Sequence, residues 1–266
     1  MLRLGIIGYG AIAHHLLAAA AEGQLPGVAI AAILVRRPRA EPGQSAALLT
    51  HEPDRFFAAK PDAVLECAGH AAVREHGERA LREGADLLVT SVGAFADTAL
   101  LDRMVDSAVA AKRRLILPSA GIGALDILAA AAVGGLEAVH VTVRKDALSW
   151  RGTEAETAHD LGRLAGAVTL HDGPVREGAR RYPQNVNIAA ATALAGIGLD
   201  RTRLTIIADP AIATHQVEIE ASGRFGSFRF AEEVIPSEEN PKTGRLVAMA
   251  VLKTVRQLRS PLVIGW

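Results

Sequence analysis

The chain has 266 residues, half of them hydrophobic, and its 29 lysines and arginines balance its 29 aspartates and glutamates. This length predicts two domains with a sizeable buried core. The balanced charge argues against the basic surface that duplex nucleic acid or an anionic membrane selects, so we expect small-molecule partners. The opening residues, MLRLGIIGYG, turn glycine-rich after a short apolar run, unlike a signal peptide. No apolar stretch reaches the roughly 20 residues of a membrane span.

The cysteine and histidine content argues against an internal disulfide and against a metal site. The single cysteine, Cys67, cannot form an internal disulfide and fits a reducing, cytoplasmic compartment. No HxxxH or CxxC spacing occurs, and the adjacent His14 and His15 point in different directions on a helix. We therefore expect no metal site.

The first 120 or so residues alternate short β-branched runs with alanine-rich helical patterns, which is typical of a parallel sheet covered by helices. The expected strands are Leu2–Gly8, Val28–Val35, Ala63–Ala68, Asp86–Val92 and Arg114–Ser119. The expected helices are Ala11–Gly23, Ala71–Gly84 and Asp97–Lys112, two of which end at a glycine. The segment Arg36–Gly43 is rich in Pro, Gly and charge and is expected to form a loop.

The pattern changes after Pro118, where alternating segments predict a mostly antiparallel sheet. The expected strands are Leu136–Trp150, Arg203–Pro210, Thr214–Gly223 and Ser227–Ile235, with a tight hairpin turn at Gly223–Ser227. The expected helices are Gln184–Gly198 and the amphipathic Lys242–Arg259, which follows Pro241. The second domain is therefore expected to be α+β.

Gly8, Gly10 and Ala13 form a GxGxxA pattern directly after an apolar strand and directly before a helix. The first glycine permits a tight turn, the second lets the backbone approach a pyrophosphate, and the alanine allows close helix packing. The amides of Ala11 and Ile12 would then point at the phosphates. This context predicts a site for NAD or NADP, while a tight turn without a ligand is the alternative.

These patterns together predict an α/β fold, a Rossmann-type doubly wound parallel sheet with a second α+β domain of mostly antiparallel sheet. The expected domains are 1–118 for the dinucleotide, 119–240 for substrate and catalysis, and 241–266 as a C-terminal helix that packs back at the domain interface. The cleft between domains is expected to close around cofactor and substrate and exclude water.

The second strand ends in LVRRPR, where an acidic residue would bind the ribose 2′-hydroxyl of NAD and an arginine the 2′-phosphate of NADP. Arg36 and Arg37 therefore favour NADP without excluding NAD. Arg36 is also placed to stack on an adenine ring. A solvated charged loop is the alternative interpretation.

The loops Cys67–Val73 and Ser91–Phe95 follow the third and fourth strands, at the sheet edge where open α/β folds bind ligands. Cys67 is a candidate nucleophile, but its place at the end of an apolar run favours a buried small hydrophobe. His70 could contact the cofactor or simply cap a helix.

Several segments resemble the L-aspartate dehydrogenase family over nearly the whole chain. They are GIIGYGAIA, PSAGIGALD (Pro118–Asp126), RKDALSWRGTEAE (Arg144–Glu156), YPQNVNIAAATALAGIGLD (Tyr182–Asp200), ADPAIATHQVEIEASGRFG (Ala208–Gly226) and NPKTGRLVA (Asn240–Ala248). The resemblance implies oxidative deamination of L-aspartate to iminoaspartate, which hydrolyses to oxaloacetate and ammonia, and the reverse reductive amination. Where the family often reads SGA, this chain has Ser119, Ala120 and Gly121. The backbone of Ala120 and Gly121 is expected to meet the nicotinamide.

Hydride transfer from the substrate Cα requires a base, and histidine titrates closest to neutral pH. Of nine histidines, His215 follows ADPAIAT at the expected start of a strand facing the cleft, and it matches the family's catalytic histidine. A core or surface histidine on an edge strand is the alternative.

Asn185 and Asn187 begin an expected helix, where amides can hold a carboxamide or substrate without adding charge. The resemblance assigns Asn185 to the cofactor and Asn187 to substrate or catalysis, and N-capping would explain one of them. Lys145 is a third catalytic candidate, since a dicarboxylate needs a cationic partner and an ammonium would polarise the imine, although a strand lysine is often solvated. Thr153 ranks below it as a hydroxyl donor.

Two other functions fit the same residues. One is a related dehydrogenase or imine reductase acting on homoserine or a dihydrodipicolinate-like imine. The other is a non-catalytic protein that senses dinucleotides, for which replacing His215 would leave function unchanged. A homodimer is expected because alternating segments such as THQVEIEA give the second domain's sheet an exposed face. Covering by the helix Lys242–Arg259 is the alternative.

Overall fold

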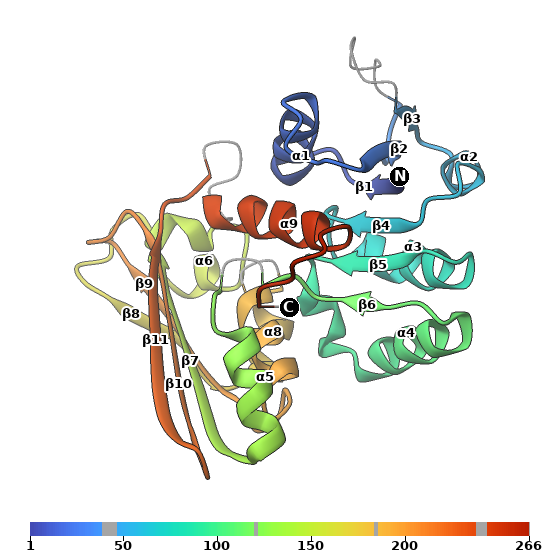
Figure 1. Ribbon diagram of the computed structural model, residues 1–266. Coiled ribbons are helices and arrows are strands. Elements are labelled where there is room, and N and C mark those ends of the chain that lie inside the picture. Colours follow the sequence, from blue (N-terminus) through green and yellow to red (C-terminus); the bar gives the residue numbers. More distant parts are fainter. Residues whose placement is uncertain (39–46, 120–121, 184–185, 238–243, 266) are drawn as a thin grey trace. The chain divides into compact units, whose positions relative to one another are not determined.

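The computed structural model describes residues 1–38, 47–119, 122–183, 186–237 and 244–265 (Figure 1). The chain divides into two compact units, Met1–Pro118 with Ala248–Trp266, and Ser119–Val247. Each unit has its own sheet. Among the described residues, no helix has the length and apolar character needed to cross a membrane.

The sheet of the first unit has six parallel strands in the order β3-β2-β1-β4-β5-β6. The strands are β1 (Leu2–Ile7), β2 (Val28–Leu34), β3 (Leu48–Thr50), β4 (Ala63–Glu66), β5 (Asp86–Val89) and β6 (Leu115–Ile116). The strand order reverses between β1 and β4, which is the point where dinucleotides bind in doubly wound folds. The predicted Rossmann-type sheet is confirmed, and β3 is a strand that the sequence did not indicate.

The helices of this unit begin and end at residues suited to those positions. They are α1 (Ala11–Ala21), α2 (Pro53–Ala58), α3 (His70–Arg82), the 3-10 helix η1 (Val92–Ala96), α4 (Thr98–Ala111) and α9 (Arg245–Gln257). Asp97 caps α4 by accepting a hydrogen bond from the amide of Leu100 at 3.2 Å. Gly23 and Gly84 follow α1 and α3 with φ of +73° and +94°, the left-handed conformation expected at glycine helix ends.

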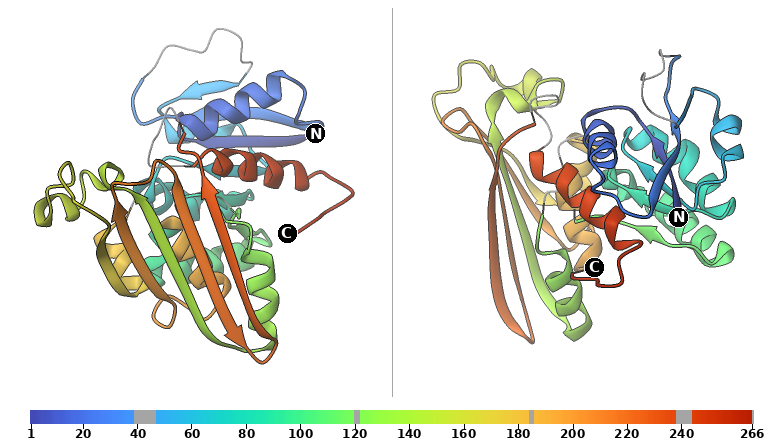
Figure 2. Two further views of the ribbon diagram at one scale, coloured as in Figure 1. Left: turned by 90° about the vertical axis from the view of Figure 1, so that its left-hand side faces the viewer. Right: turned by 45° about the horizontal axis from the view of Figure 1, so that its top comes forward.

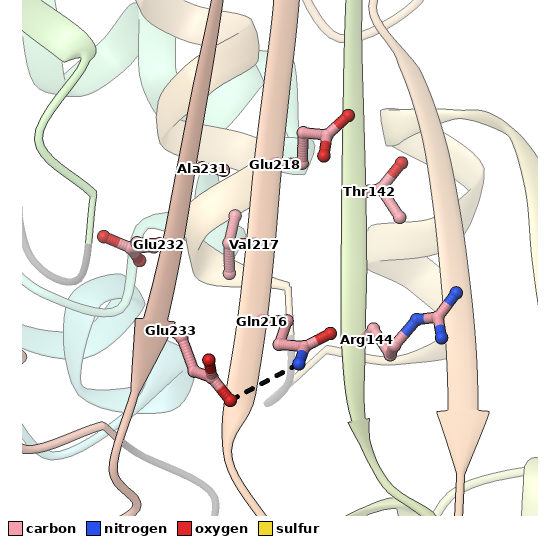
Figure 3. Close-up of a pocket in the computed structure, with 8 residues that line it drawn as sticks. All are labelled: Thr142, Arg144, Gln216, Val217, Glu218, Ala231, Glu232 and Glu233. Atoms are coloured by element: carbon pink, nitrogen blue, oxygen red, sulfur yellow. Dashed lines mark hydrogen bonds between the residues drawn. The ribbon is translucent and has the colours of Figure 1, made fainter. Parts of the chain in front are cut away.

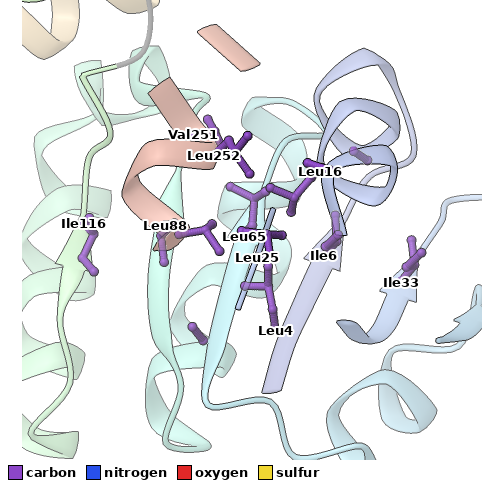
Figure 4. Packing of buried hydrophobic residues seen from close by; sticks show 14 of the residues in the cluster. Leu4, Ile6, Leu16, Leu25, Ile33, Leu65, Leu88, Ile116, Val251 and Leu252 are labelled. Atoms are coloured by element: carbon purple, nitrogen blue, oxygen red, sulfur yellow. The ribbon is translucent and has the colours of Figure 1, made fainter. Parts of the chain in front are cut away.

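The core of the first unit joins the sheet, α1 and the C-terminal helix α9 (Figure 4). Leu4, Ile6 and Leu65 from the sheet are fully buried, as is Leu16 of α1. The buried side chains of α9 in the same cluster are Val251, Leu252 and Val255. The chain therefore returns from the second unit to complete the core of the first, because the apolar face of α9 is buried there. The expected place of residues 241–266 at a domain interface stays a prediction.

The sheet of the second unit has five strands in the order β11-β10-β7-β9-β8. They are β7 (Leu136–Asp146), β8 (Val168–Pro174), β9 (Arg203–Asp209), β10 (His215–Gly223) and β11 (Gly226–Val234). Only β7 and β9 pair in parallel, so the predicted mostly antiparallel sheet is confirmed. The predicted hairpin is confirmed too, because Gly223 pairs with Gly226 around a two-residue turn.

The predicted strand Leu136–Trp150 is too long by four residues. The strand β7 ends at Asp146, and the 3-10 helix η2 (Ala147–Trp150) follows. The Asp146 carboxylate accepts a hydrogen bond from the amide of Leu148 at 3.0 Å, which starts the turn. The sequence did not indicate β8, which ends in His-Asp-Gly-Pro.

Helices cover one face of this second sheet and leave the other face open (Figure 2). The helices of the unit are α5 (Leu125–Gly134), α6 (Ala155–Ala158), α7 (Val175–Arg181) and α8 (Asn187–Ala195). Val139, Val141 and Val143 of β7 are buried on the face that α5 and α8 contact, which we call the inner face. Thr142 and Arg144 alternate with them on the outer face.

Candidate active site

The turn between β1 and α1 has the geometry that the GxGxxA pattern predicts. Gly8 has φ of +112°, and a Cβ there would lie 2.9 Å from the carbonyl oxygen of Cys67, so no other residue fits. At Gly10, the residue before α1, a Cβ would meet nothing within 4 Å. The backbone is thus bare and open at the start of α1, where Ala11 and Ile12 have amides without partners inside the helix. Ala13 is fully buried.

This turn fits the pyrophosphate of a dinucleotide. A side chain at Gly10 would fill the space that the phosphates need, and the amides of α1 supply donors together with the positive end of the helix dipole. Arg36 and Arg37 lie exposed just after β2. They follow the strand at the end where doubly wound folds bind the adenosine ribose.

Glu66 is a functional candidate that the sequence did not reveal. It ends β4, is 1% exposed, and binds the loops after β4 and β5. The amides of Ala68 and Gly69 donate to its carboxylate at 2.8 and 2.7 Å, and Ser91 donates its hydroxyl at 2.9 Å and its amide at 3.2 Å. Burial raises the pKa of Glu66 above its ordinary value, and these hydrogen bonds offset only part of that rise. Glu66 thus fixes the two loops expected to wall the cofactor.

Replacing Glu66 by Ala should lower the free energy of unfolding by about 2–4 kcal/mol, because buried amides lose their acceptor. Urea denaturation measures this loss, and isothermal titration should show weaker cofactor binding. Glu75→Ala is a matched control on α3, since the Glu75 side chain is 70% exposed, and it should change stability by less than about 0.5 kcal/mol. Equal stability of the two variants would contradict this role for Glu66.

Cys67 and His70 are the two other candidate residues at this edge of the first sheet. Burial raises the pKa of the Cys67 thiol, which disfavours a nucleophilic thiolate and supports a small hydrophobe. His70 is the first residue of α3, and Gly69, with φ of +122°, occupies the cap position.

In the second unit, Lys145 and His215 are buried on the inner face of the sheet, each 5% exposed. Lys145 follows Val141 and Val143 on β7, and His215 precedes Val217 and Ile219 on β10.

The strand register puts these two side chains side by side. The β7–β10 register ends with Arg144 opposite Gln216, and one further step along both strands places Lys145 opposite His215. Lys145 also pairs with Ala208 of β9. An ammonium and an imidazole thus share the end of one buried sheet face, although 70 residues separate them in the sequence.

The surroundings of this pair are aromatic and close-packed. The Lys145 ammonium lies 5.8 Å from the centre of the Trp150 ring. Trp150 packs edge-on against Tyr182 at 5.7 Å, and both are buried. The Thr153 hydroxyl donates to the carbonyl of Trp150 at 2.6 Å and accepts from the amide of Ala155 at 3.3 Å. Thr153 therefore shapes the turn after η2.

Asn187 is the first residue of α8, half-buried. The cap residue is Val186, which makes no side-chain cap, so N-capping does not explain Asn187. The other predicted cofactor contacts, Ala120, Gly121 and Asn185, lie outside the described residues. Within the described ranges, no group of His, Cys, Asp and Glu side chains could hold a metal ion.

The doubly wound sheet with an open glycine turn, followed by a mixed sheet with buried ionisable groups, defines the architecture of a nicotinamide-dependent dehydrogenase. Residues 8–118 match the family model for the NAD-binding domain of homoserine dehydrogenase. Residues 126–258 match the model for the C-terminal domain of aspartate dehydrogenase. The chain belongs to the L-aspartate dehydrogenase family.

Relatives support this membership over almost the full length. L-Aspartate dehydrogenase of Ruegeria pomeroyi is 43% identical, covering 96% of this chain and 92% of the relative. That of Pseudomonas aeruginosa is 40% identical, covering 96% and 97%. Aspartate dehydrogenase from Thermotoga maritima, a solved structure, shares the fold with a TM-score of 0.78, 24% identity and full coverage of both chains.

Proposed function

We propose that this protein is an NAD(P)-dependent L-aspartate dehydrogenase, which oxidatively deaminates L-aspartate to iminoaspartate and, after hydrolysis, to oxaloacetate and ammonia, in a reversible reaction. The observation that carries the proposal is the buried Lys145 and His215 pair, in the unit that matches the aspartate dehydrogenase C-terminal model. Its expected substrates are small molecules.

The nicotinamide, when bound, accepts the hydride from the substrate Cα. Gly10, Ala11 and Ile12 would hold the pyrophosphate at the start of α1, where a Cβ on Gly10 would meet nothing within 4 Å, and Gly8 would contribute by allowing the tight turn before them. Asn185, Ala120 and Gly121 are proposed to bind the nicotinamide end.

The second unit supplies the residues that act on the substrate. The Lys145 ammonium would bind a carboxylate of aspartate and polarise the imine, since burial strengthens the attraction between opposite charges. An imidazole nitrogen of His215 would accept a proton from the water that attacks the imine. The Asn187 amide would orient the substrate without adding charge.

A substrate panel distinguishes this activity from its nearest alternative. Purified protein is assayed with L-aspartate, L-homoserine and other L-amino acids in the presence of NAD or NADP. A kcat/KM for L-aspartate well above those for the others supports the proposal. Turnover confined to homoserine, or reduction of a dihydrodipicolinate-like imine alone, would support the related dehydrogenase or reductase instead.

Arg36 is proposed to favour NADP by binding its 2′-phosphate. Arg36→Ala should raise the KM for NADPH about 10-fold or more, because a charge-assisted hydrogen bond to phosphate is lost, and leave that for NADH nearly unchanged. Steady-state kinetics with both cofactors measure the ratio. Arg163→Ala, at a side chain 88% exposed in the second unit, is the control and should leave both values unchanged. Equal effects of Arg36→Ala on the two cofactors would contradict the role.

The outer face of the second sheet is proposed to form a homodimer. A hollow on that face is lined by Thr142, Arg144, Gln216 and Glu218 among others, and no helix in the described part of the unit covers it (Figure 3). A second copy, related by a two-fold axis, would cover this hollow with the same face of its own sheet. Light scattering after gel filtration should give twice the chain mass of 27.9 kDa, and a monomer would refute the proposal. A cytoplasmic location is proposed because the single cysteine forms no internal disulfide, which fits a reducing compartment.

A further inference from the structure

Glu232 lies on β11, the edge strand next to β10, and faces the inner side of the sheet. Phe228, Phe230, Glu232 and Val234 are half-buried in alternation with the exposed Arg229, Ala231 and Glu233. Figure 3 shows the side chains of Glu232 and Glu233 on opposite sides of the strand. Two adjacent glutamates therefore belong to two different faces, and only Glu232 shares the face of His215 and Lys145.

The register brings Glu232 close to His215. His215 pairs with Val234, and Val217 pairs with Glu232, so Glu232 and His215 are diagonal neighbours. Diagonal neighbours in an antiparallel pair are about 7–8 Å apart between Cα atoms, within the reach of long side chains. Among the described residues, the register therefore places Glu232, His215 and Lys145 together at this end of the inner face, and the buried His171 lies on the same face opposite Ile206.

The carboxylate of Glu232 differs from those of the two buried acids Glu66 and Asp209. Its Oε1 is buried without a hydrogen-bond partner among the described residues. Glu66 accepts four hydrogen bonds, and Asp209 accepts one from Arg144 at 2.9 Å and one from the amide of Ala211 at 2.9 Å. A buried acceptor without a partner is costly, which is typical of a site that waits for a ligand.

Burial raises the pKa of Glu232 to about 7. A carboxyl group in that range can both take and return a proton at neutral pH, which is the property of an efficient acid–base residue. Gly123, which lies before α5, packs near the neighbouring Phe230 ring and brings no charge to this part of the face.

The proposed reaction needs two proton acceptors. The substrate ammonium must lose one proton before hydride leaves Cα, and the water that attacks the imine must lose another. We propose that Glu232 is the second acid–base residue, taking the proton of the substrate ammonium and returning it to the nitrogen when ammonia leaves, while His215 serves the water. This inference rests on the proposed function.

The protons and electrons of this sequence balance. The Glu232 carboxylate takes a proton from the ammonium, and the C–H electron pair leaves Cα as hydride for the oxidised nicotinamide, which gives the iminium. Water adds to the iminium carbon and yields its proton to His215, which releases it to solvent. Glu232 then returns its proton to the carbinolamine nitrogen. The C–N bond breaks as the hydroxyl proton passes to His215, which has by then released its first proton to solvent, and this gives oxaloacetate and ammonia.

An inward-facing charge on an edge strand can instead prevent strands from pairing between molecules, which is a structural role. Glu232→Gln separates the two roles, because the amide keeps the shape and polarity but cannot carry the proton. Glu233→Gln is the matched control one residue along, on the outer face, where Glu233 accepts hydrogen bonds from Thr214 and Gln216.

The experiment measures kcat and KM for L-aspartate from pH 5.5 to 9.5 in wild type and both variants, with melting temperatures. We expect Glu232→Gln to lower kcat about 10²-fold with little change in the KM for cofactor, and to abolish the rise in rate through the ionisation near pH 7. Glu233→Gln should match wild type. The melting temperature of Glu232→Gln at pH 8 should equal or exceed that of wild type, because a buried charge is removed.

A second variant covers the case in which Glu232→Gln folds poorly. In Glu232→Ala, added formate should restore activity at least several-fold, which a structural role would not permit. Wild-type kcat and pH profile in Glu232→Gln, or no rescue by formate, would overturn the inference while leaving the proposed function intact. An inactive wild type would overturn both.

Discussion

Replacing His215 by Asn should lower kcat for L-aspartate at least about 10²-fold while leaving the KM for cofactor nearly unchanged. His215 is 5% exposed and lies opposite Lys145, so the variant removes the base but keeps a polar side chain of similar size. Steady-state kinetics and a melting curve measure the two effects. His51→Asn, at an exposed position of the first unit, is the control.

The same variant tests the alternative of a protein that senses dinucleotides. A sensor would keep its function without His215, whereas the enzyme would keep cofactor binding and lose turnover. Unchanged kcat in His215→Asn, with His51→Asn as reference, would contradict a role for this histidine as the base.

Replacing Lys145 by Met should lower kcat/KM for L-aspartate by about 10²-fold, because the substrate loses a charge-assisted hydrogen bond. Methionine has a similar length and suits a face built of valines, so the fold should persist. Kinetics with varied L-aspartate and circular dichroism measure both expectations.

Lys253→Met, at an exposed position of α9, provides the comparison for loss of one positive charge. The KM for L-aspartate should rise only in Lys145→Met. An unaltered kcat/KM in that variant would show that another cation binds the substrate carboxylates.

Much of the fold could be predicted from the sequence because its signals are local. The strand before Gly8 and the helix after Gly10 are both indicated by composition, and the structure has them at Leu2–Ile7 and Ala11–Ala21. The strand β3 escaped prediction because three residues are too few to show a period. The strand β8 escaped because Asp, Gly and Pro are depleted in strands, and a register shift between Thr169 and His171 interrupts its pattern.

The candidate site could be predicted only in part, because some of its residues depend on long-range pairing. His215 and Lys145 were both indicated, but their adjacency follows from the β7–β10 register. Glu66 ends a run that reads as an apolar strand, and its role becomes visible only when two loops converge on it. For Glu232 and Glu233, the sequence does not say which of two adjacent glutamates faces His215, whereas the pairing with β10 does.

Aspartate dehydrogenase activity can be measured directly as the loss of absorbance of reduced nicotinamide with oxaloacetate and ammonium, using NADPH and NADH in parallel. We expect a loss that requires both oxaloacetate and ammonium and disappears in His215→Asn. Tight binding of either cofactor without any such loss would contradict the assignment to aspartate and favour another imine or a sensor.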